Sequence, residues 1–221
     1  MKTPLVIFGA GDIAQLAQFY FSNDSSYKPV GFTVDAGYLR EATCCGLPVV
    51  PFEEVATRYP VDAYAMFVAL SYSKLNEVRK SKYLATKALG YRMASYVSSH
   101  ATVLNEGRIG DNCFILEDNT IQPFAVIGSN VTLWSGNHIG HHSIIRDHCF
   151  IASHVVVSGG VEIGESCFVG VNATLRDHIT VGEKCVVGAG TMLLADAAPE
   201  GVYIGEATER SKVPSTKLRK I

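Results

Sequence analysis

Residues 121–157 read IQPFAVIGSNVTLWSGNHIGHHSIIRDHCFIASHVVV, and within them an aliphatic residue returns at every sixth position. The same period runs unbroken from Val103 to Leu193. Its members are Val103, Ile109, Ile115, Ile121, Ile127, Leu133, Ile139, Ile145, Ile151, Val157, Ile163, Val169, Leu175, Val181, Val187 and Leu193. Small side chains often stand two positions earlier, among them Gly107, Cys113, Ala125, Ser143, Cys149, Cys167, Ala173 and Cys185. This pattern predicts short strands wound into a β-helix of hexapeptide repeats.

The six-residue repeats are themselves grouped into a longer repeat of eighteen residues. It relates IGDNC (109–113), IGSNV (127–131), IRDHC (145–149), IGESC (163–167) and VGEKC (181–185). Since eighteen residues are three hexads, each coil has three flat sides, and these five segments lie on one corner. Residues eighteen apart then stack at the strand spacing of about 4.8 Å. We therefore expect a three-sided prism that buries a continuous aliphatic column.

Composition narrows the class of protein. The 221 residues are 48% hydrophobic and 18% charged, with a net charge of −2, which argues against broad nucleic-acid binding. No apolar run approaches the roughly 20 residues of a membrane span, and Met1 to Pro4 lead straight into a strand-like segment without a signal-type region. Four cysteines share the small inward position, whereas Cys44 and Cys45 are adjacent and lack metal-ligand spacing. Reduced, buried thiols and a cytoplasmic location are expected.

The residues before the prism alternate between strand and helix patterns. We expect strands over 5–8, 29–34, 49–50, 64–70 and 92–97, with helices over 13–20, 53–59 and 74–89. This order predicts a small Rossmann-like parallel sheet. The bend near Ser98 divides the chain into an α/β domain, 1–98, and a β-helix domain with a C-terminal tail, 99–221.

The first predicted turn resembles half of a dinucleotide fingerprint. Gly9 and Gly11 follow a buried strand, Ala14 occupies the third small position, and Asp35 closes the second strand. A helix N-terminus beside such a turn can bind phosphate, so we expect Gly9, Gly11, Asp12 and Asp35 to bind a nucleotide. The alternative is a tight turn without a ligand. A redox dinucleotide is disfavoured, because nothing beside the turn resembles a hydride-transfer site.

Six of the seven histidines lie in the repeat region, although a hexapeptide prism requires none: His138, His141, His142, His148, His154 and His178. Stacking by eighteen places Gly159 and Gly160 one coil beyond His141 and His142, and Asp177 and His178 one coil further. We expect a notch in which His141 is a general base and a backbone N–H binds an oxyanion. No outward carboxylate or thiol has ligand spacing to these imidazoles, so no metal is expected.

Four other polar residues of the repeat receive structural interpretations. His148 and His154 are expected in hydrogen-bonded surface ladders. Asn119 and Asn137 fall on the small inward position of successive coils and are expected to form an interior amide ladder.

A small nucleotide-binding domain, a hexapeptide β-helix and the segment NHIGHH (137–142) together resemble the bacterial nucleotide-sugar acetyltransferases. This group acetylates the amino sugars of bacillosamine, perosamine and viosamine nucleotides and includes sialic-acid O-acetyltransferase relatives. The resemblance implies a left-handed β-helix, a homotrimer, acetyl-CoA in the groove between neighbouring β-helices, and a nucleotide held by the N-terminal domain.

The same resemblance implies roles for individual residues. His141 matches the catalytic base and Gly159 the oxyanion donor, with His142 beside the base where relatives often carry Glu or Asp. Coenzyme binding is assigned to Gly159, Gly160, Asp177, Gly188 and Arg210. Arg210 begins a basic tail that also holds Lys212, Lys217, Arg219 and Lys220. The tail segment from Gly205 to Arg210 lacks the Pro and Ala of the family pattern.

The activity expected is transfer of an acetyl group from acetyl-CoA to the amino group of a nucleotide-linked amino-deoxy sugar, in the synthesis of surface polysaccharide such as lipopolysaccharide O-antigen. The amine would attack directly in a ternary complex while His141 takes its proton. Two alternatives stay open. One is acylation of a sugar hydroxyl, or transfer of another acyl group such as hydroxybutyryl; the other is a non-catalytic scaffold that binds nucleotide sugars.

Overall fold

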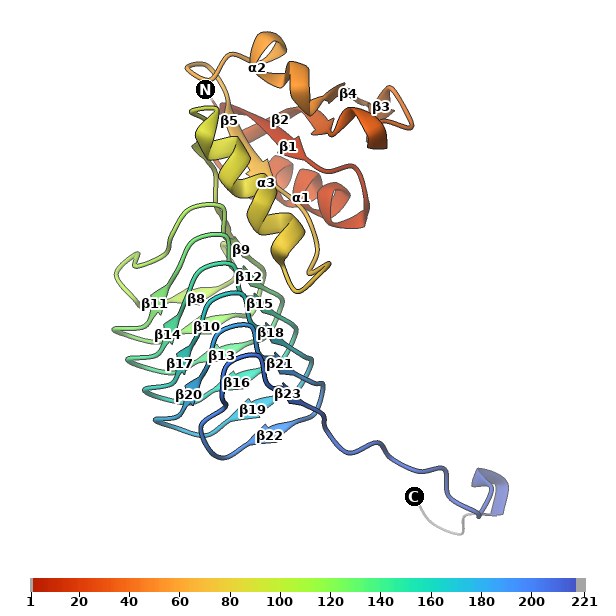
Figure 1. Ribbon diagram of the computed structural model, residues 1–221, viewed down its shortest axis with the longest axis vertical. Coiled ribbons are helices and arrows are strands. Elements are labelled where there is room, and N and C mark those ends of the chain that lie inside the picture. The colour runs from red at the N-terminus through yellow and green to blue at the C-terminus, as the bar shows by residue number, and fades with distance from the viewer. Residues whose placement is uncertain (1, 218–221) are drawn as a thin grey trace.

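A computed structural model describes residues 2–217 and shows an α/β domain stacked on one end of a triangular prism (Figure 1). The sheet of the α/β domain has the order β3-β4-β2-β1-β5-β6. Its strands are β1 (Thr3–Phe8), β2 (Tyr27–Val34), β3 (Thr43–Cys44), β4 (Leu47–Pro51), β5 (Ala65–Val68) and β6 (Arg92–Met93). All neighbours are parallel except β3 and β4, which form an antiparallel hairpin. The expected parallel sheet is therefore present, with one antiparallel edge strand added.

The helices cover the two faces of this sheet. Apolar side chains of α1 (Asp12–Asn23) pack with Leu5 and Ile7 on the face nearer the prism. On the opposite face, α2 (Val55–Arg58) and α3 (Glu77–Ala88) pack with Val6 and Phe8. The alternation of side chains along β1 thus supplies both cores.

Two predicted elements differ in extent. The helix expected over 74–89 begins only at Glu77, because Lys74, Leu75 and Asn76 all have positive φ and form a turn. The strand expected over 92–97 is two strands: β6 closes the α/β sheet, whereas β7 (Tyr96–Val97) pairs with the prism strand β9. The prism therefore starts a few residues ahead of the boundary expected at residue 98.

Three parallel sheets form the sides of the prism. Face A contains β7, β9 (Phe114–Ile115), β12 (Thr132–Leu133), β15 (Phe150–Ile151), β18 (Phe168–Val169), β21 (Val186–Val187) and β23 (Val202–Tyr203). Face B contains β8 (Thr102–Val103), β10 (Thr120–Ile121), β13 (His138–Ile139), β16 (Val156–Val157), β19 (Thr174–Leu175) and β22 (Met192–Leu193). Face C contains β11 (Val126–Ile127), β14 (Ile144–Ile145), β17 (Glu162–Ile163) and β20 (Thr180–Val181).

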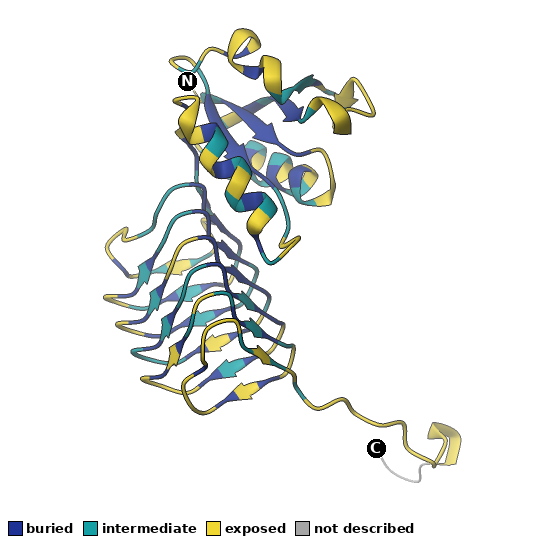
Figure 2. Cartoon of the chain, viewed as in Figure 1, coloured by how far each residue is buried: buried dark blue, intermediate teal, exposed yellow. Residues whose placement is uncertain are grey.

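The register confirms the eighteen-residue coil. Ile121 pairs with Ile139, and Ile139 with Val157, each a step of eighteen residues. These aliphatic residues are fully buried in one continuous core (Figure 2). The chain runs from face A to face B to face C, so each coil has an A/B, a B/C and a C/A corner.

Small polar groups line the interior at the corners. Cys113, Cys149, Cys167 and Cys185 are buried free thiols, and each donates a hydrogen bond to a carbonyl of the next coil at 3.0–3.1 Å. Asn119 and Asn137 are also buried, but they do not form the expected amide ladder. Each donates to the carbonyl of Trp134 instead, and the Asn137 side-chain oxygen accepts the Val155 N–H, so backbone groups take the place of the neighbouring amide.

The amide ladder lies on the C/A corner. Asn112 donates to Asn130, and the Asn130 amide lies 2.9 Å from Nδ1 of His148. His148 is buried against Tyr83 of α3, so the expected surface position is wrong. Burial lowers the pKa of His148 and favours the neutral imidazole that can accept from Asn130.

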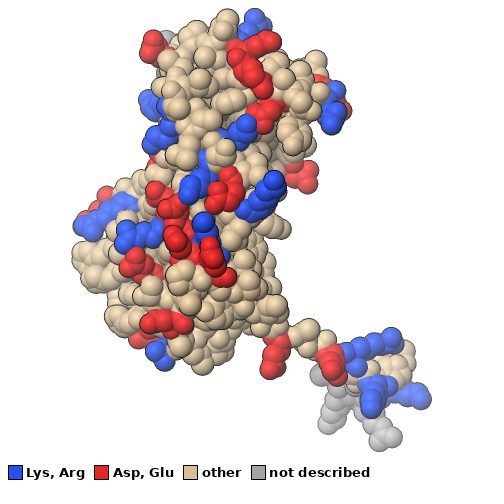
Figure 3. Space-filling view, in the orientation of Figure 1, with Lys and Arg blue, Asp and Glu red and all other residues tan. Residues whose placement is uncertain are grey.

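Two sets of contacts join the domains: an apolar cluster in which Phe67 and Tyr96 pack with Phe114, and polar contacts from α3. The fully buried Arg79 donates to the carbonyls of Asn130, His148 and Cys149, which lie on two successive segments of the C/A corner. Around it lie the ion pairs Lys80–Glu165 and Lys87–Asp111, and the charged side chains in this view concentrate there (Figure 3). Every polar contact from α3 to the prism falls on this corner, which fixes how the α/β domain sits.

Beyond β23 the chain leaves the prism. Residues 206–217 are exposed and end in a short 3₁₀ helix, η3 (Ser215–Lys217). Arg219 and Lys220 of the expected basic tail lie outside the described residues. None of the helices within residues 2–217 is long and apolar enough to cross a membrane.

Candidate active site

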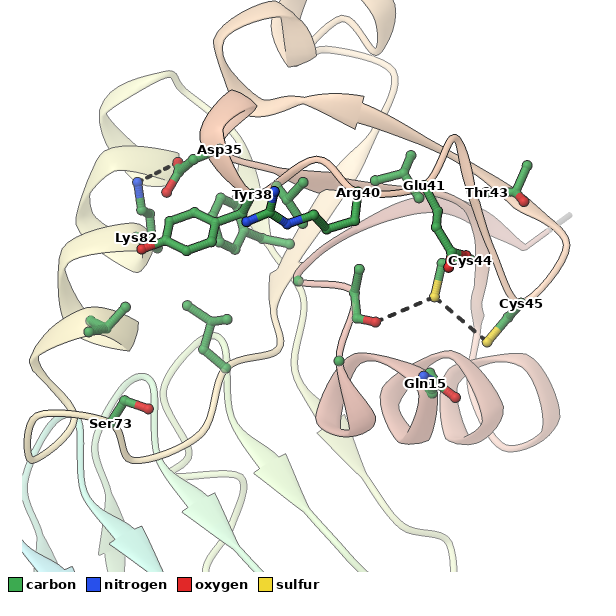
Figure 4. Close-up of a pocket in the computed structure, with 18 residues that line it drawn as sticks. Gln15, Asp35, Tyr38, Arg40, Glu41, Thr43, Cys44, Cys45, Ser73 and Lys82 are labelled. Atoms are coloured by element: carbon green, nitrogen blue, oxygen red, sulfur yellow. Dashed lines mark hydrogen bonds and ion pairs between the residues drawn. The ribbon is translucent and has the colours of Figure 1, made fainter.

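The α/β domain carries a cleft of about 1000 Å³ at the carboxyl ends of β1 and β2 (Figure 4). Its walls come from the glycine turn, α1, the segment after β2, the β3–β4 hairpin and α3. The lining residues are Phe8, Gly9, Ala10, Gly11, Gln15, Val34, Asp35, Tyr38, Arg40, Glu41, Thr43, Cys44, Cys45, Val49, Leu70, Ser73, Val78 and Lys82. Strand ends that meet beside a helix N-terminus are the usual ligand site of such sheets.

The glycine turn is shaped by a close backbone approach. Gly9 has a φ of +118°, and a Cβ added there would lie 2.7 Å from the carbonyl oxygen of Ala69, so only glycine fits. Gly11 precedes α1, whose first N–H groups are directed toward the turn and favour an anion. Asp12 opens the helix but is exposed and does not line the cleft. Of the four residues expected at a nucleotide, three therefore line one cleft.

Asp35 acts in the cleft together with a cation that the sequence did not single out. Its Oδ1 lies 2.5 Å from Nζ of Lys82 on α3. The ammonium also lies 5.6 Å from the ring centroids of Phe8 and Phe52, which hold its stem between aromatic faces. The pair leaves the second oxygen of Asp35 available to a ligand N–H. Tyr38 and Arg40 extend into the same space (Figure 4).

The histidine pair lies on the B/C corner, between β13 and β14. Nδ1 of His141 and Nδ1 of His142 are 3.1 Å apart, so that one ring nitrogen can donate its N–H to the other and the two then share a single proton between them in a hydrogen bond. The Gln122 side chain accepts the backbone N–H of His141 at 2.9 Å, and the ring of His142 packs on Phe124. When His141 carries the shared proton, its Nε2 has a free lone pair, which is the tautomer that a general base needs.

Gly159 lies directly against the His141 ring, as the eighteen-residue spacing predicted. A Cβ at this position would be 2.6 Å from Cε1 and 2.7 Å from Nε2 of His141. Within the described residues 2–217, the Gly159 N–H has no hydrogen-bond acceptor. A base nitrogen and an uncommitted backbone donor therefore lie side by side, an arrangement that suits acyl transfer.

The other predicted coenzyme residues do not gather around His141 in one chain. Gly160 faces the His178 ring, with its added Cβ 2.4 Å from Nδ1, and Asp177 is exposed on the same B/C corner. Gly188 lies on the A/B corner after β21, and Arg210 is in the exposed tail. No group of three or more His, Cys, Asp or Glu residues within residues 2–217 could hold a metal ion.

The cleft and the histidine pair lie on different sides of the prism. The α/β domain contacts face A through Tyr72, which packs on Phe150 and Phe168, and contacts the two corners that flank this face. The B/C corner of His141 is the corner opposite face A. His141 therefore does not line the cleft of its own chain, and it lies on the side of the prism away from the contacts of the α/β domain.

A second, smaller hollow of about 390 Å³ borders the cleft. Its aromatic walls are Tyr72, Trp134, Phe150 and Phe168, and Ile13 closes the side next to the glycine turn. The eighteen-residue period places Phe150 and Phe168 on one face, but no sequence pattern places Ile13 and Tyr72 of the α/β domain beside them.

Comparison with known proteins first defines the class. The bacterial transferase hexapeptide family (six repeats) matches residues 124–159, and the family described as the hexapeptide repeat of succinyl-transferase matches residues 160–195. No curated protein matches the chain by sequence. The chain carries the hexapeptide repeats of the bacterial transferases, on a left-handed β-helix preceded by an α/β domain.

Solved structures share this whole architecture. Perosamine N-acetyltransferase from Caulobacter crescentus, in complex with CoA and GDP-perosamine, has 22% identity and a TM-score of 0.82, covering 91% of this chain and 93% of that chain. The acetyltransferase domain of PglB from Neisseria gonorrhoeae, in complex with acetyl coenzyme A, has 21% identity and a TM-score of 0.81, covering 93% and 97%. WeeI from Acinetobacter baumannii has 19% identity and a TM-score of 0.77, covering 91% and 96%. The fold expected from the resemblance to nucleotide-sugar acetyltransferases is confirmed.

Proposed function

We propose that the protein is an acetyl-CoA-dependent N-acetyltransferase that acts on the amino group of a nucleotide-linked amino-deoxy sugar, with His141 as general base. The observation that carries the proposal is the B/C corner, where the His141 ring, oriented by His142, lies against the uncommitted N–H of Gly159. The hexapeptide repeats and the shared architecture support acyl transfer.

The residues divide the chemistry between them. The sugar amine attacks the thioester carbonyl, so that a C–N bond forms and the C–S bond breaks, while Nε2 of His141 accepts the amine proton. That proton leaves on the departing thiolate. The Gly159 N–H donates to the carbonyl oxygen as it becomes an oxyanion. His142 keeps the second ring nitrogen of His141 occupied, in the position where a carboxylate often stands.

The opposed positions of cleft and histidine pair support a shared site. We propose a homotrimer in which the cleft of one copy delivers the nucleotide sugar to the His141 of a neighbour, with acetyl-CoA in the groove between prisms. Gly160, Asp177, Gly188 and Arg210 remain the proposed coenzyme contacts. Because they occupy two corners and the tail, a groove built from two copies is what could bring them together.

The cleft supplies the proposed nucleotide site through Gly9, Gly11 and the Asp35–Lys82 pair. A diphosphate suits the N-terminus of α1, and Asp35 can accept an N–H from a base or an O–H from a ribose. Asp12 is retained as a proposed contact for the phosphates through its backbone N–H at the start of α1, because its exposed carboxylate would repel them. The six free thiols are consistent with a reducing cytoplasm, where nucleotide sugars for surface polysaccharide such as O-antigen would be modified.

Coenzyme A release from acetyl-CoA, measured with a panel of nucleotide-linked amino and hydroxy sugars, tests the proposal. We expect turnover with an amino sugar and a product heavier by one acetyl group. His141→Ala should lower kcat about 10²–10⁴-fold with the oligomer intact. His154→Ala is the matched control, because His154 is an exposed imidazole on the A/B corner. Turnover of His141→Ala like that of His154→Ala would contradict the assignment.

Two other outcomes would replace the proposed N-acetyltransferase activity with a different function. An acylated hydroxyl in the product would establish O-acylation instead. Failure of coenzyme A to bind in calorimetry would favour a scaffold that binds nucleotide sugars without catalysis.

A further inference from the structure

Two neighbouring thiols lie in the wall of the cleft, apart from the residues used above. Sγ of Cys44 and Sγ of Cys45 are 4.0 Å apart, and both line the cleft (Figure 4). Cys44 ends β3 and is half-buried, whereas Cys45 is exposed. The other four cysteines are buried inside the prism. Only this pair is therefore open to a reagent that enters the cleft.

The hairpin forces the two sulfurs onto the same side. Successive side chains of a strand point to opposite faces, which would separate the thiols. Here Cys45 and Gly46 have φ values of 49° and 75°, the positive pair that a two-residue hairpin turn requires. Asn, Asp or Gly is the usual residue at the first of these positions, so a cysteine there is costly. The turn nevertheless brings Cys45 beside Cys44.

The sulfur separation suits capture of one soft atom better than a disulfide. Two bonds of about 2.3 Å to one atom separate their sulfurs by about 3.5 Å at a pyramidal angle near 100° and by about 3.8 Å at a tetrahedral angle, both close to the observed 4.0 Å. A disulfide needs about 2.05 Å between sulfurs, and neighbouring Cα atoms about 3.8 Å apart fall below its usual range. The pair can therefore bridge a single atom once the sulfurs approach by about half an ångström or less.

We propose that Cys44 and Cys45 form a dithiol site that captures a thiophilic centre satisfied by two sulfurs, such as trivalent arsenic, and that capture closes the cleft to its ligand. Two sulfurs without a third metal-binding side chain fit such a centre, since residues 2–217 hold no three-ligand cluster. Burial beside Cys45 raises the pKa of the Cys44 thiol to about 11, which keeps it a protonated thiol until a ligand displaces the proton.

The coupling to the cleft runs through the glycine turn. The Cys44 thiol contacts the carbonyl oxygen of Ala10 at 3.7 Å, between Gly9 and Gly11. Capture removes the thiol proton and places the bound group against this carbonyl, where phosphates would lie. Closure of the cleft rests on the proposed function, because it assumes that the cleft is the nucleotide site. The reaction of the two thiols does not depend on that assumption.

Phenylarsine oxide is the probe for the full-length protein. Two As–S bonds form as the arsenic–oxygen bond breaks, the oxygen leaves as water with both thiol protons, and arsenic stays trivalent. We expect intact-mass spectrometry to show one adduct that 2,3-dimercaptopropanol removes. Cys44→Ser and Cys45→Ser should each lose it, whereas Cys185→Ser, a buried prism control, should keep it. No adduct on the wild type, or an adduct on both Ser variants, would overturn the site.

Nucleotide binding is measured separately, by calorimetry with UDP, GDP and dTDP before and after labelling. Binding to the unlabelled protein that weakens at least about 10-fold in the adduct supports closure, and unchanged binding refutes it. Failure of the unlabelled protein to bind any nucleotide would refute both the nucleotide assignment and the closure, while the adduct test would still decide the dithiol site.

Discussion

Gly159→Ala tests whether the proposed base and oxyanion donor depend on a side-chain-free position. The new methyl carbon would lie 2.6 Å from Cε1 of His141, whereas ordinary contact begins at 3.4 Å, so the ring must retreat by about 0.8 Å. Gly159 has no positive φ, so alanine adds no backbone strain. A misplacement of about 1 Å can cost about 10²-fold in rate, and we expect a fall in kcat of that order.

Steady-state kinetics with acetyl-CoA and the nucleotide sugar measures this effect, and a thermal melt within about 2 °C of wild type confirms that the fold is kept. A double-mutant cycle shows whether the loss acts through the imidazole. In a His141→Ala background the ring is gone, so adding Gly159→Ala should cost less than about 3-fold. Wild-type kcat in the single variant, or a full 10²-fold further loss in the double variant, would refute the reasoning.

The cleft and the domain junction can be tested with three more variants. Lys82→Met removes the partner of Asp35 but keeps the stem between its aromatic neighbours, and should raise KM for the nucleotide sugar about 10-fold with little change in kcat; an unchanged KM contradicts the role. Arg79→Met removes the Arg79 N–H groups from the buried carbonyls of Asn130 and His148, whereas that of Cys149 keeps the Thr132 N–H; it should lower the free energy of unfolding in urea by at least about 2 kcal/mol, so a loss under about 0.5 kcal/mol would be inconsistent. The lowered pKa of His148 means that the unfolded chain takes up a proton first, so stability should decline as the pH falls below about 6.5 and down to the folded pKa. His148→Gln should flatten urea-derived stability over that interval, and an unaltered slope would exclude His148 as its source.

The amino-acid sequence alone determined the prism. Each coil repeats the same local pattern, with an aliphatic residue at positions such as Ile139 and Val157. Each coil also packs only on its neighbouring coils, so the local pattern is enough to predict the stacking. The same regularity predicted the contact between His141 and Gly159, because residues near a multiple of eighteen apart must lie beside one another. The alternation of strands and helices likewise predicted the α/β domain, including the glycine turn with Gly9 and Gly11.

Only the tertiary structure showed how the two domains pack together and which side chains line the cleft. Lys82 reaches Asp35 because α3 crosses the sheet, and Arg79 holds α3 against three carbonyls on two segments of the prism. His148 carries no local signal that separates it from His154, yet docking of α3 buries the first and leaves the second exposed. Such contacts join residues far apart in the chain, with no period to reveal them. For the same reason, the position of His141 on the corner opposite the α/β domain emerged only when both domains could be seen together.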